Sequence, residues 1–286
     1  MIVGVIPNPE KDAGYAYTRV VCAYLEDHGH TPIMEASDAS AADWPKAAAS
    51  SEMVYRNAGF VVVLGGDGTM LRISHVAALY GAEMLGINLG NLGYLTDADR
   101  NDGLQALDIT LRGEARREKR MMLMIDGERT QNLAHHDKLA LNDVYLTRGG
   151  FGKMITFHLY INNQYMETLR ADGVIVATPT GSTAYNLSAG GPILSPEGDM
   201  IVITPICPHA LYTRPWVVSG HDVIEIRTAG QAAQAIHVTI DGEPRLTLTP
   251  DDTLTIRNSG CDAYILKTSP MNFYDILRTK MGVSQP

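Results

Sequence analysis

Short apolar runs punctuated by turn residues open the chain. Residues 2–6 form one such run, which ends at Pro7, Asn8 and Pro9. Residues 60–64 form another between two glycines, and residues 84–87 form a third. Runs of this length are too short for globular helices, so they predict fully buried strands.

Helical periodicity appears between these runs. Apolar positions three to four residues apart predict helices around 17–25 and 70–77, and residues 38–49 are compatible with a helix or a loop. Buried strands that alternate with helices favour a parallel sheet with helices on both faces.

The pattern changes from about residue 121 onward. Long helical patterns are nearly absent, and segments that alternate between apolar and polar positions take their place at 157–161, 223–227, 237–240, 246–249 and 254–256. This alternation predicts a β-rich second domain. We therefore expect a first domain over 1–100 plus the tail 270–286, a connector over 101–120 and a second domain over 121–269. The tail is expected to be helical over 272–280.

Composition narrows the classes of function. The formal net charge of −9 argues against a nucleic-acid partner, which usually meets a basic face. The three cysteines lie far apart and form no C-x-x-C pair, which is typical of reduced thiols in the cytoplasm. No apolar run approaches the ~20 residues that span a bilayer, so neither a membrane partner nor a signal peptide is expected.

A glycine-rich turn carries the first candidate chemistry. Residues 65–69 read Gly-Gly-Asp-Gly-Thr between a predicted strand and a predicted helix. Glycines there present backbone N–H groups to an anion, and the helix N-terminus adds partial positive charge. Asp67 would repel phosphate, so it needs another role, either at an attacking hydroxyl or near Mg²⁺. The alternative is an ordinary turn with Asp67 as the N-cap of the helix.

A second segment follows a buried strand at 174–177. Residues 178–183 read Thr-Pro-Thr-Gly-Ser-Thr and gather hydroxyls and amides beside Tyr185, an aromatic suited to a nucleotide. Taken alone, such a stretch is more often just a turn.

Together, residues 65–69 and 172–186 resemble the paired signature of the NAD kinase family. Further matches follow in the same order along nearly the whole chain, at 90–94, 142–143, 205–209, 214–215, 241–242 and 272–280. The first motif is shared with lipid kinases of the same superfamily, whereas the second is highly specific. The resemblance implies a Rossmann-like parallel α/β domain followed by a β-rich C-terminal domain, with NAD between them.

The resemblance also implies residue roles. Asp67 matches the catalytic aspartate beside the adenosine 2′-hydroxyl. The expected phosphate-binding residues are Gly65, Gly66, Gly68 and Thr69. The residues expected to bind NAD are Gly68, Tyr94, Asn142, Asp143, Asp172, Thr180, Ser182, Thr183, Ala184, Tyr185, Ser188 and Asp241. Asp143 departs from the family, which usually has Glu there. No metal site built from protein side chains is expected.

Three of these positions have plain structural alternatives. Residues 142–143 could simply start a strand, Tyr94 could belong to a core, and residues 241–242 could form a hairpin turn.

The resemblance implies an ATP-dependent NAD kinase, with Mg²⁺ or another divalent metal accompanying ATP and with a homodimer or homotetramer in the cytoplasm. Inorganic polyphosphate stays open as a donor. Two rivals remain. A lipid kinase would share the first turn but leave 172–186 unexplained, and a nucleotide sensor would keep the pocket without turnover.

Overall fold

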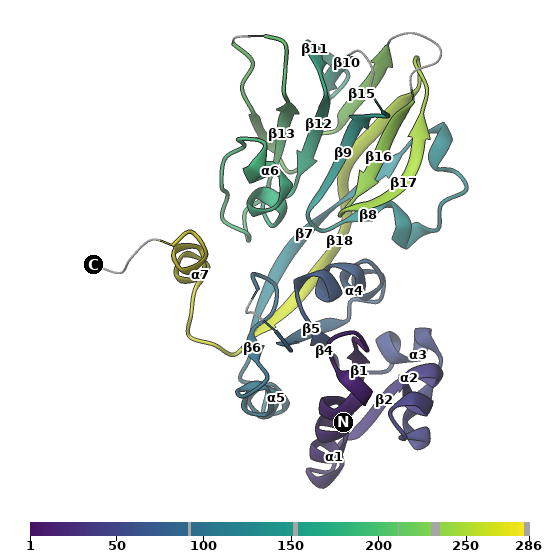
Figure 1. Cartoon of the computed structure of the whole chain (residues 1–286), viewed down its shortest axis with the longest axis vertical. Helices are drawn as coiled ribbons and strands as arrows, with labels where there is room; N and C mark the ends of the chain where they lie inside the picture. The colour runs from purple at the N-terminus through teal and green to yellow at the C-terminus, as the bar shows by residue number, and fades with distance from the viewer. Residues whose placement is uncertain (91–92, 151–153, 211, 230–234, 283–286) are drawn as a thin grey trace. The chain divides into compact units, whose positions relative to one another are not determined.

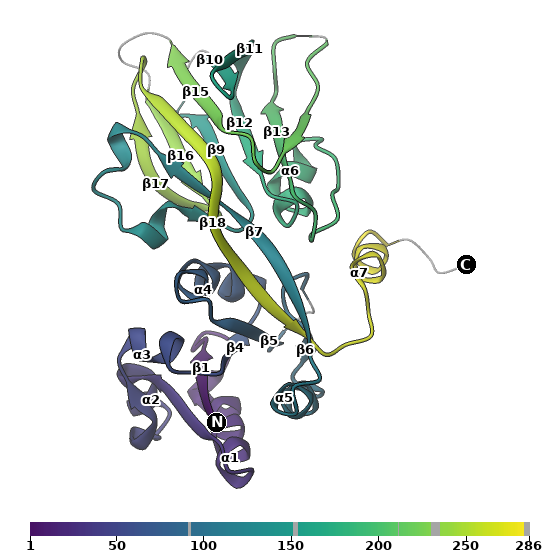
Figure 2. The same cartoon turned by 180° about the vertical axis from the view of Figure 1, so that it is seen from behind.

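The computed structural model describes residues 1–90, 93–150, 154–210, 212–229 and 235–282. The chain divides into two compact units, which Figures 1 and 2 show from opposite sides. The first unit comprises residues 1–119 and 263–286, and the second comprises residues 120–262. The stretch 101–119, which the sequence assigns to a connector, therefore groups with the first unit.

The first unit is built on a parallel sheet. Its strands are β1 (Ile2–Pro7), β2 (Thr31–Glu35), β3 (Ala48–Ala49), β4 (Phe60–Gly65), β5 (Glu83–Asn88) and β6 (Ala98–Asp99). The order runs β5-β4-β1-β2-β3, and β6 pairs with β5. Strand β5 also pairs in parallel with the last residues of β18 (Thr253–Lys267), at Tyr264 and Ile265. The predicted parallel sheet is confirmed.

Helices cover both faces of this sheet. They are α1 (Ala16–Asp27), α2 (Ala36–Ala41), α3 (Ser51–Arg56), α4 (Asp67–Tyr80) and α5 (Gly103–Leu111). The tail forms a further helix, α7 (Phe273–Lys280), which buries none of its residues. On one face, Val62 and Leu85 share a core with Leu25 of α1 and Leu107 of α5. On the other, Met70 of α4 lies directly over Gly86.

The strand order contains a reversal next to β1. Strand β2 pairs with β1 on one side, and β4 pairs with β1 on the other. The loop after β1 and the turn after β4 thus leave the same edge of neighbouring strands. Ligands of open α/β sheets bind at such switch points, because the diverging connections leave a crevice there.

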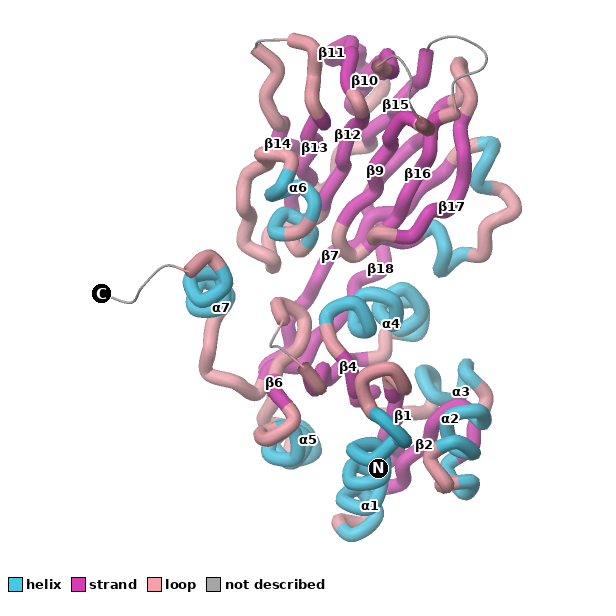
Figure 3. The backbone as a smooth tube through the Cα atoms, in the orientation of Figure 1, coloured by secondary structure: helices cyan, strands magenta, loops and turns pink. Residues whose placement is uncertain are grey.

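The second unit is almost entirely β, as Figure 3 makes clear. One antiparallel sheet has the order β14-β13-β12-β9-β16-β17. Its strands are β9 (Asp143–Arg148), β12 (Gly173–Ala177), β13 (Met200–Ile206), β14 (Trp216–Ser219), β16 (Ile236–Ile240) and β17 (Glu243–Leu248). The predicted alternating segments at 237–240 and 246–249 fall on its last two strands.

A second group of antiparallel strands completes this unit. Strands β10 (Ile155–Ile161), β11 (Gln164–Ala171) and β15 (Ile224–Ala229) pair with each other and with β18. Nearby, β7 (Arg116–Asp126) pairs with β8 (Leu139–Ala140). Apolar side chains of both groups share one core, including Leu146, Phe157, Val176 and Ile226.

Strand β12 does not alternate, because both of its faces are covered. Val174 and Val176 face the shared core, whereas Ile175 and Ala177 pack with Leu194 and other side chains on the opposite face. The run 174–177 therefore reads as continuous apolar sequence. The segment that follows contains a short 3₁₀ turn (Gly181–Thr183) and α6 (Tyr185–Ser188). In the part of the chain that is described, no helix is long and apolar enough to cross a membrane.

Candidate nucleotide-binding site

The turn after β4 enters α4 directly. Gly66 is the N-cap and makes no side-chain cap, and the helix begins at Asp67. The alternative interpretation of Asp67 as the N-cap is therefore wrong. A Cβ at Gly66 would lie 2.3 Å from Nζ of Lys11, so a larger residue there would displace the end of the lysine side chain. An ammonium group thus lies beside the backbone of the turn, next to the positive end of a 14-residue helix.

The loop after β1 braces this turn. Asn8 N–H donates to the Leu64 carbonyl at 2.8 Å. The Asn8 side chain donates from Nδ2 to Oγ1 of Thr69 at 2.8 Å. Thr69 is buried, so its hydroxyl supports the turn from inside, whereas Gly68 is exposed and a Cβ on it would meet nothing within 4 Å. Of the four predicted phosphate-binding residues, Gly68 presents its backbone most openly.

The Asp67 carboxylate is held by a loop that follows β5. Its Oδ2 accepts a hydrogen bond from Tyr94 N–H at 2.7 Å. Its Oδ1 accepts from Leu95 N–H at 3.1 Å and from Thr96 N–H at 3.3 Å. Three backbone donors therefore fix the orientation of one carboxylate.

The contact between this loop and Asp67 depends on a glycine. A Cβ at Gly93 would lie 1.6 Å from Oδ1 of Asp67, so any side chain there would displace the carboxylate. Sequence reasoning found residues 90–94 as a family match but did not find this steric role.

Tyr94 lies at the surface of the same unit with partners from α7. Its ring is 6.3 Å from that of Phe273, and the Lys280 ammonium lies 4.8 Å from the ring centroid. Burial, and secondarily the charge of Asp67, raise the pKa of Tyr94 above 10.0, so its hydroxyl is protonated at neutral pH. Tyr94 is only partly buried. It is therefore not a full core residue, and its predicted place in an adenosine pocket stays a prediction.

In the second unit, the turn after β12 folds against the residues that precede β9. Thr178 N–H donates to the Asn142 carbonyl at 2.8 Å, and the Thr178 hydroxyl donates to the Leu141 carbonyl at 2.5 Å. At Gly181 a Cβ would lie only 2.0 Å from the Asn142 carbonyl oxygen. A glycine is thus required where the two predicted segments meet.

Asp241 joins this cluster from the β16–β17 hairpin. Asp241 and Gly242 have φ angles of 51° and 85°, as a two-residue hairpin turn requires. The Asp241 carboxylate accepts hydrogen bonds from the N–H groups of Leu141, Asn142 and Asp143 at 2.7–2.9 Å. Residues 241–242 are therefore a hairpin turn and Asp143 starts a strand, but both also belong to the cluster.

Asp143 is the electrostatically unusual member. It is 3% exposed, and burial, followed by repulsion from Asp241, raises its pKa from 3.8 to about 7. Two carboxylates share one cluster, and Asp241 is the one that accepts the three backbone N–H groups. Near neutral pH, Asp143 is therefore divided between its protonated and ionised forms.

The hydroxyls of the turn are mostly committed to the turn itself. Ser182 is fully buried, donates to the Pro179 carbonyl at 2.6 Å and accepts from Leu194 N–H at 3.0 Å. Thr180 accepts from Arg120 at 3.4 Å, and Thr183 donates to the Thr180 carbonyl at 3.3 Å. The structure thus places Ser182 as a support of the turn.

The residues after the turn are more exposed. Tyr185 is 39% exposed and packs edge-on against Tyr145, with ring centroids 5.1 Å apart. Ala184 is partly buried and Ser188 is exposed. Sequence reasoning missed Tyr145 and the fully buried Asn186, whose amide bonds to the Ser182 and Pro192 carbonyls. The alternating pattern of β9 could have indicated Tyr145.

Asp172 does not join this cluster. It precedes β12, and the turn at Thr178 follows it, so the strand separates them by roughly 20 Å. Asp172 instead forms an ion pair with Arg148, at 2.9 Å between Nε and Oδ1. Arg148 ends β9 and was not found from the sequence.

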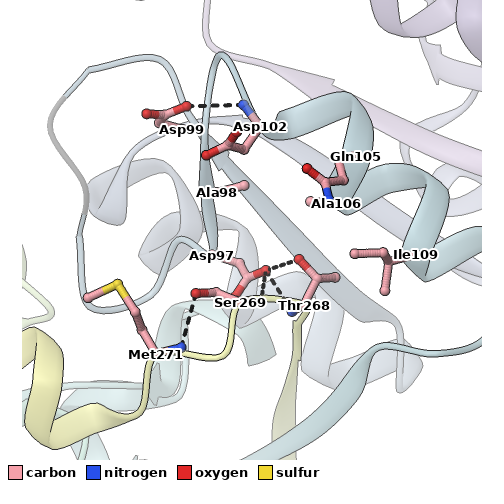
Figure 4. Close-up of a pocket in the computed structure, with 10 residues that line it drawn as sticks. All are labelled: Asp97, Ala98, Asp99, Asp102, Gln105, Ala106, Ile109, Thr268, Ser269 and Met271. Carbon is pink, nitrogen blue, oxygen red and sulfur yellow. Dashed lines mark hydrogen bonds between the residues drawn. The ribbon is translucent and has the colours of Figure 1, made fainter.

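The first unit also has a pocket of about 250 Å³ between α5 and residues 268–271 (Figure 4). Its lining includes Asp97, Asp102 and Met271, and none of the residues selected from the sequence. Within the described ranges, no group of three or more His, Cys, Asp or Glu side chains could hold a metal ion.

A glycine turn between a buried parallel strand and a helix, at a switch point of the sheet, is characteristic of nucleotide-binding α/β proteins. The comparisons with known proteins narrow this class. Residues 3–115 match the model of the ATP-NAD kinase N-terminal domain, and residues 141–268 match that of the ATP-NAD kinase C-terminal domain. The chain belongs to the NAD kinase family, as its resemblance predicted.

Relatives and solved structures agree. The NAD kinase of Caldanaerobacter subterraneus subsp. tengcongensis is 41% identical over 284 residues, 98% of each chain. That of Thermoanaerobacter sp. strain X514 is 40% identical over the same shares. Yeast NADH kinase complexed with NADH is similar in fold, with a TM-score of 0.85, 24% identity and coverage of 100% of this chain and 89% of the other. An Archaeoglobus fulgidus NAD kinase in complex with ATP is also similar in fold, with a TM-score of 0.75 and 24% identity. The match covers 99% of this chain and 100% of the other.

Two glycine-to-alanine substitutions should separate folding from ligand binding. Gly68→Ala places its methyl in open space within a helix, so we expect the free energy of unfolding to rise by about 0.5–1 kcal/mol. NADP formation should nevertheless fall, because the methyl obstructs an approaching phosphate.

Gly93→Ala should lower the free energy of unfolding by about 1–3 kcal/mol and abolish most NADP formation. Thermal unfolding and an NADP assay measure both. Full activity in Gly68→Ala would remove that backbone from the site.

The raised pKa of Asp143 predicts a pH-dependent stability. Between pH 4 and 7 the folded protein holds a proton on Asp143 that the unfolded chain has lost, so the free energy of unfolding falls as pH rises through this window. Asp143→Asn removes this effect, so the variant should gain up to ~4 kcal/mol relative to the wild type between pH 4 and 8. Denaturant unfolding at each pH tests it.

The exposed Asp251 offers a matched control, because Asp251→Asn removes a carboxylate from the surface of the same unit. The difference in free energy of unfolding between Asp251→Asn and the wild type should stay constant over the same pH range. If the difference between Asp143→Asn and the wild type were also constant, the prediction would be contradicted.

Proposed function

We propose that the protein transfers the γ-phosphoryl group of ATP to the 2′-hydroxyl of the adenosine ribose of NAD and so makes NADP. Membership of the NAD kinase family supports this reaction. The observation that carries it is the carboxylate of Asp67, which three backbone N–H groups hold beside a glycine turn with an exposed backbone. The reaction is a phosphotransfer with an alcohol group as acceptor.

The turn offers binding groups for the donor phosphates. The N–H groups in the first turn of a helix carry partial positive charge. At the start of α4, Thr69 N–H donates to the Gly66 carbonyl at 2.9 Å, so the groups offered to a phosphate are those of Asp67 and Gly68. Lys11 adds a full positive charge beside Gly66. A triphosphate bound here would be neutralised by fixed groups, which is the main requirement of phosphoryl transfer.

Asp67 would orient the attacking hydroxyl. Any carboxylate is a far weaker base than the alkoxide of a sugar, so it cannot remove the proton of a sugar hydroxyl in advance. The transition state of phosphoryl transfer is loose, and the hydroxyl needs little nucleophilic activation. Asp67 therefore positions the hydroxyl and takes its proton late in the reaction.

A divalent metal would enter with the nucleotide. It would supply positive charge that offsets the negative charge of the ATP phosphates. The described residues provide no cluster of three His, Cys, Asp or Glu side chains that could hold a metal ion. We therefore propose that Mg²⁺ is held mainly by ATP itself.

The second unit offers groups suited to a dinucleotide. Asn142 and Asp143 lie with Asp241 and the turn 178–183 in one cluster, and Tyr185 presents an exposed aromatic ring next to Tyr145. Aromatic faces bind nucleobases by stacking, and a half-protonated Asp143 can donate or accept a hydrogen bond. We propose this cluster as a binding region for NAD. Homo-oligomer formation and a cytoplasmic location stay predictions.

Asp67→Asn tests the reaction directly. We expect NAD binding to persist and kcat to fall by about 10²–10⁴-fold, because the amide cannot accept the proton. NADP formation from NAD, MgATP and purified protein is followed with an NADP-specific dehydrogenase. Asp251→Asn serves as the control and should retain kcat.

Each rival gives a different result in the same assay. A lipid product in place of NADP would identify a lipid kinase, and tight NAD binding without turnover would identify a sensor. An unchanged kcat in Asp67→Asn would remove this carboxylate from the mechanism.

A further inference from the structure

The loop that holds Asp67 is itself held by the end of β18. Nζ of Lys267, the last residue of that strand, donates to the Thr96 carbonyl at 3.0 Å. The N–H of the same Thr96 donates to the Asp67 carboxylate. Lys267 is 7% exposed and Thr96 is 1% exposed. A buried ammonium group is therefore connected to a proposed catalytic residue through the backbone of one residue, Thr96.

Asp97 extends this attachment to the next residues of the C-terminal segment. Its Oδ2 accepts from Thr268 N–H at 2.7 Å, from the Thr268 hydroxyl at 2.5 Å and from Ser269 N–H at 3.3 Å. Figure 4 shows Asp97 facing Thr268 and Ser269. Its Oδ1 lies 4.0 Å from Nζ of Lys267, and its side chain is only 1% exposed.

Because Lys267 and Asp97 are both buried, their charged groups must be compensated by partners within the protein. Each charged group loses most of its hydration, which is unfavourable unless hydrogen bonds and the opposite charge offset the loss. The pair meets that condition only while residues 96–97 and 267–269 keep their places. The arrangement therefore tolerates little movement of Thr96, and Thr96 carries one of the donors to Asp67.

We propose that Lys267 and Asp97 form a positioning pair, which holds the 93–96 loop so that its N–H groups orient the Asp67 carboxylate. This inference rests on the proposed role of Asp67 in NAD phosphorylation. Lys267 does not touch the carboxylate, and it acts through the backbone of Thr96. Without Lys267 the loop would shift, and a displacement of about 1 Å at a reacting group costs up to 10²-fold in rate.

A double-mutant cycle tests the proposal. Lys267→Met should lower kcat by about 10–100-fold when Asp67 is present. If Lys267 acts through Asp67, the same substitution should change the residual kcat of Asp67→Asn by no more than about twofold. A loss of equal size in both backgrounds overturns the proposal, because it would show that Lys267 acts independently of Asp67.

Amide hydrogen exchange provides a readout that does not depend on activity. In Lys267→Met the amides of Tyr94, Leu95 and Thr96 should exchange at least about tenfold faster, because the opening of this loop becomes easier. Lys46→Met is the matched control, since Lys46 forms an exposed ion pair with Glu26 in the same unit. The control should leave both kcat and exchange at these amides unchanged.

A folding defect is handled by a second variant. If Lys267→Met fails to fold, Lys267→Met/Asp97→Asn leaves no unpaired buried charge and should show the same loss of kcat and the same faster exchange. A wild-type kcat in Lys267→Met or in Lys267→Met/Asp97→Asn overturns the inference about the pair and leaves the proposed function of the protein untouched. Wild-type kcat in Asp67→Asn overturns the proposed function of that residue, and the catalytic role of the pair with it.

Discussion

The attachment of the Asp67 carboxylate to the backbone of residues 94–96 is the interaction on which the first unit's site depends. It joins the turn after β4 to the loop after β5, because the Asp67 carboxylate accepts hydrogen bonds from this loop. Gly93 is the steric condition for this contact, because only the absence of a Cβ lets the loop approach. Lys267 donates to the Thr96 carbonyl of the same loop and lies 4.0 Å from the Asp97 carboxylate.

The same principle organises the second unit. Asp241, another carboxylate, gathers consecutive N–H groups at residues 141–143, and Gly181 allows the turn after β12 to pack against the Asn142 carbonyl. Asp143 lies buried beside Asp241, and burial raises its pKa to about 7, so it is the group in this cluster that responds to pH near neutrality.

Much of the architecture followed from local patterns. Apolar runs at 2–6, 60–64 and 84–87 predicted the central strands, because strands buried on both faces need continuous apolar sequence. Strand β2, Thr-Pro-Ile-Met-Glu, was missed because it has no continuous apolar run, and helix α3 was missed because six residues are too few to show helical periodicity. The bracing contacts were also invisible, because Asp67 bonds to residues 27–29 positions away and Asp241 to residues 98–100 positions away. Family resemblance selected these residues, and only the fold shows what they bond to.

The second unit is inserted in the sequence of the first, between residues 119 and 263. A ribosome that makes the chain from its N-terminus therefore releases Asp67 and its loop long before it releases Lys267. The nascent first unit lacks both the β18 partner of β5 and the ammonium beneath Thr96 until the inserted unit has been synthesised. The carboxylate is thus secured only when the chain is almost complete, so a truncated product carries the signature turn without its finished support.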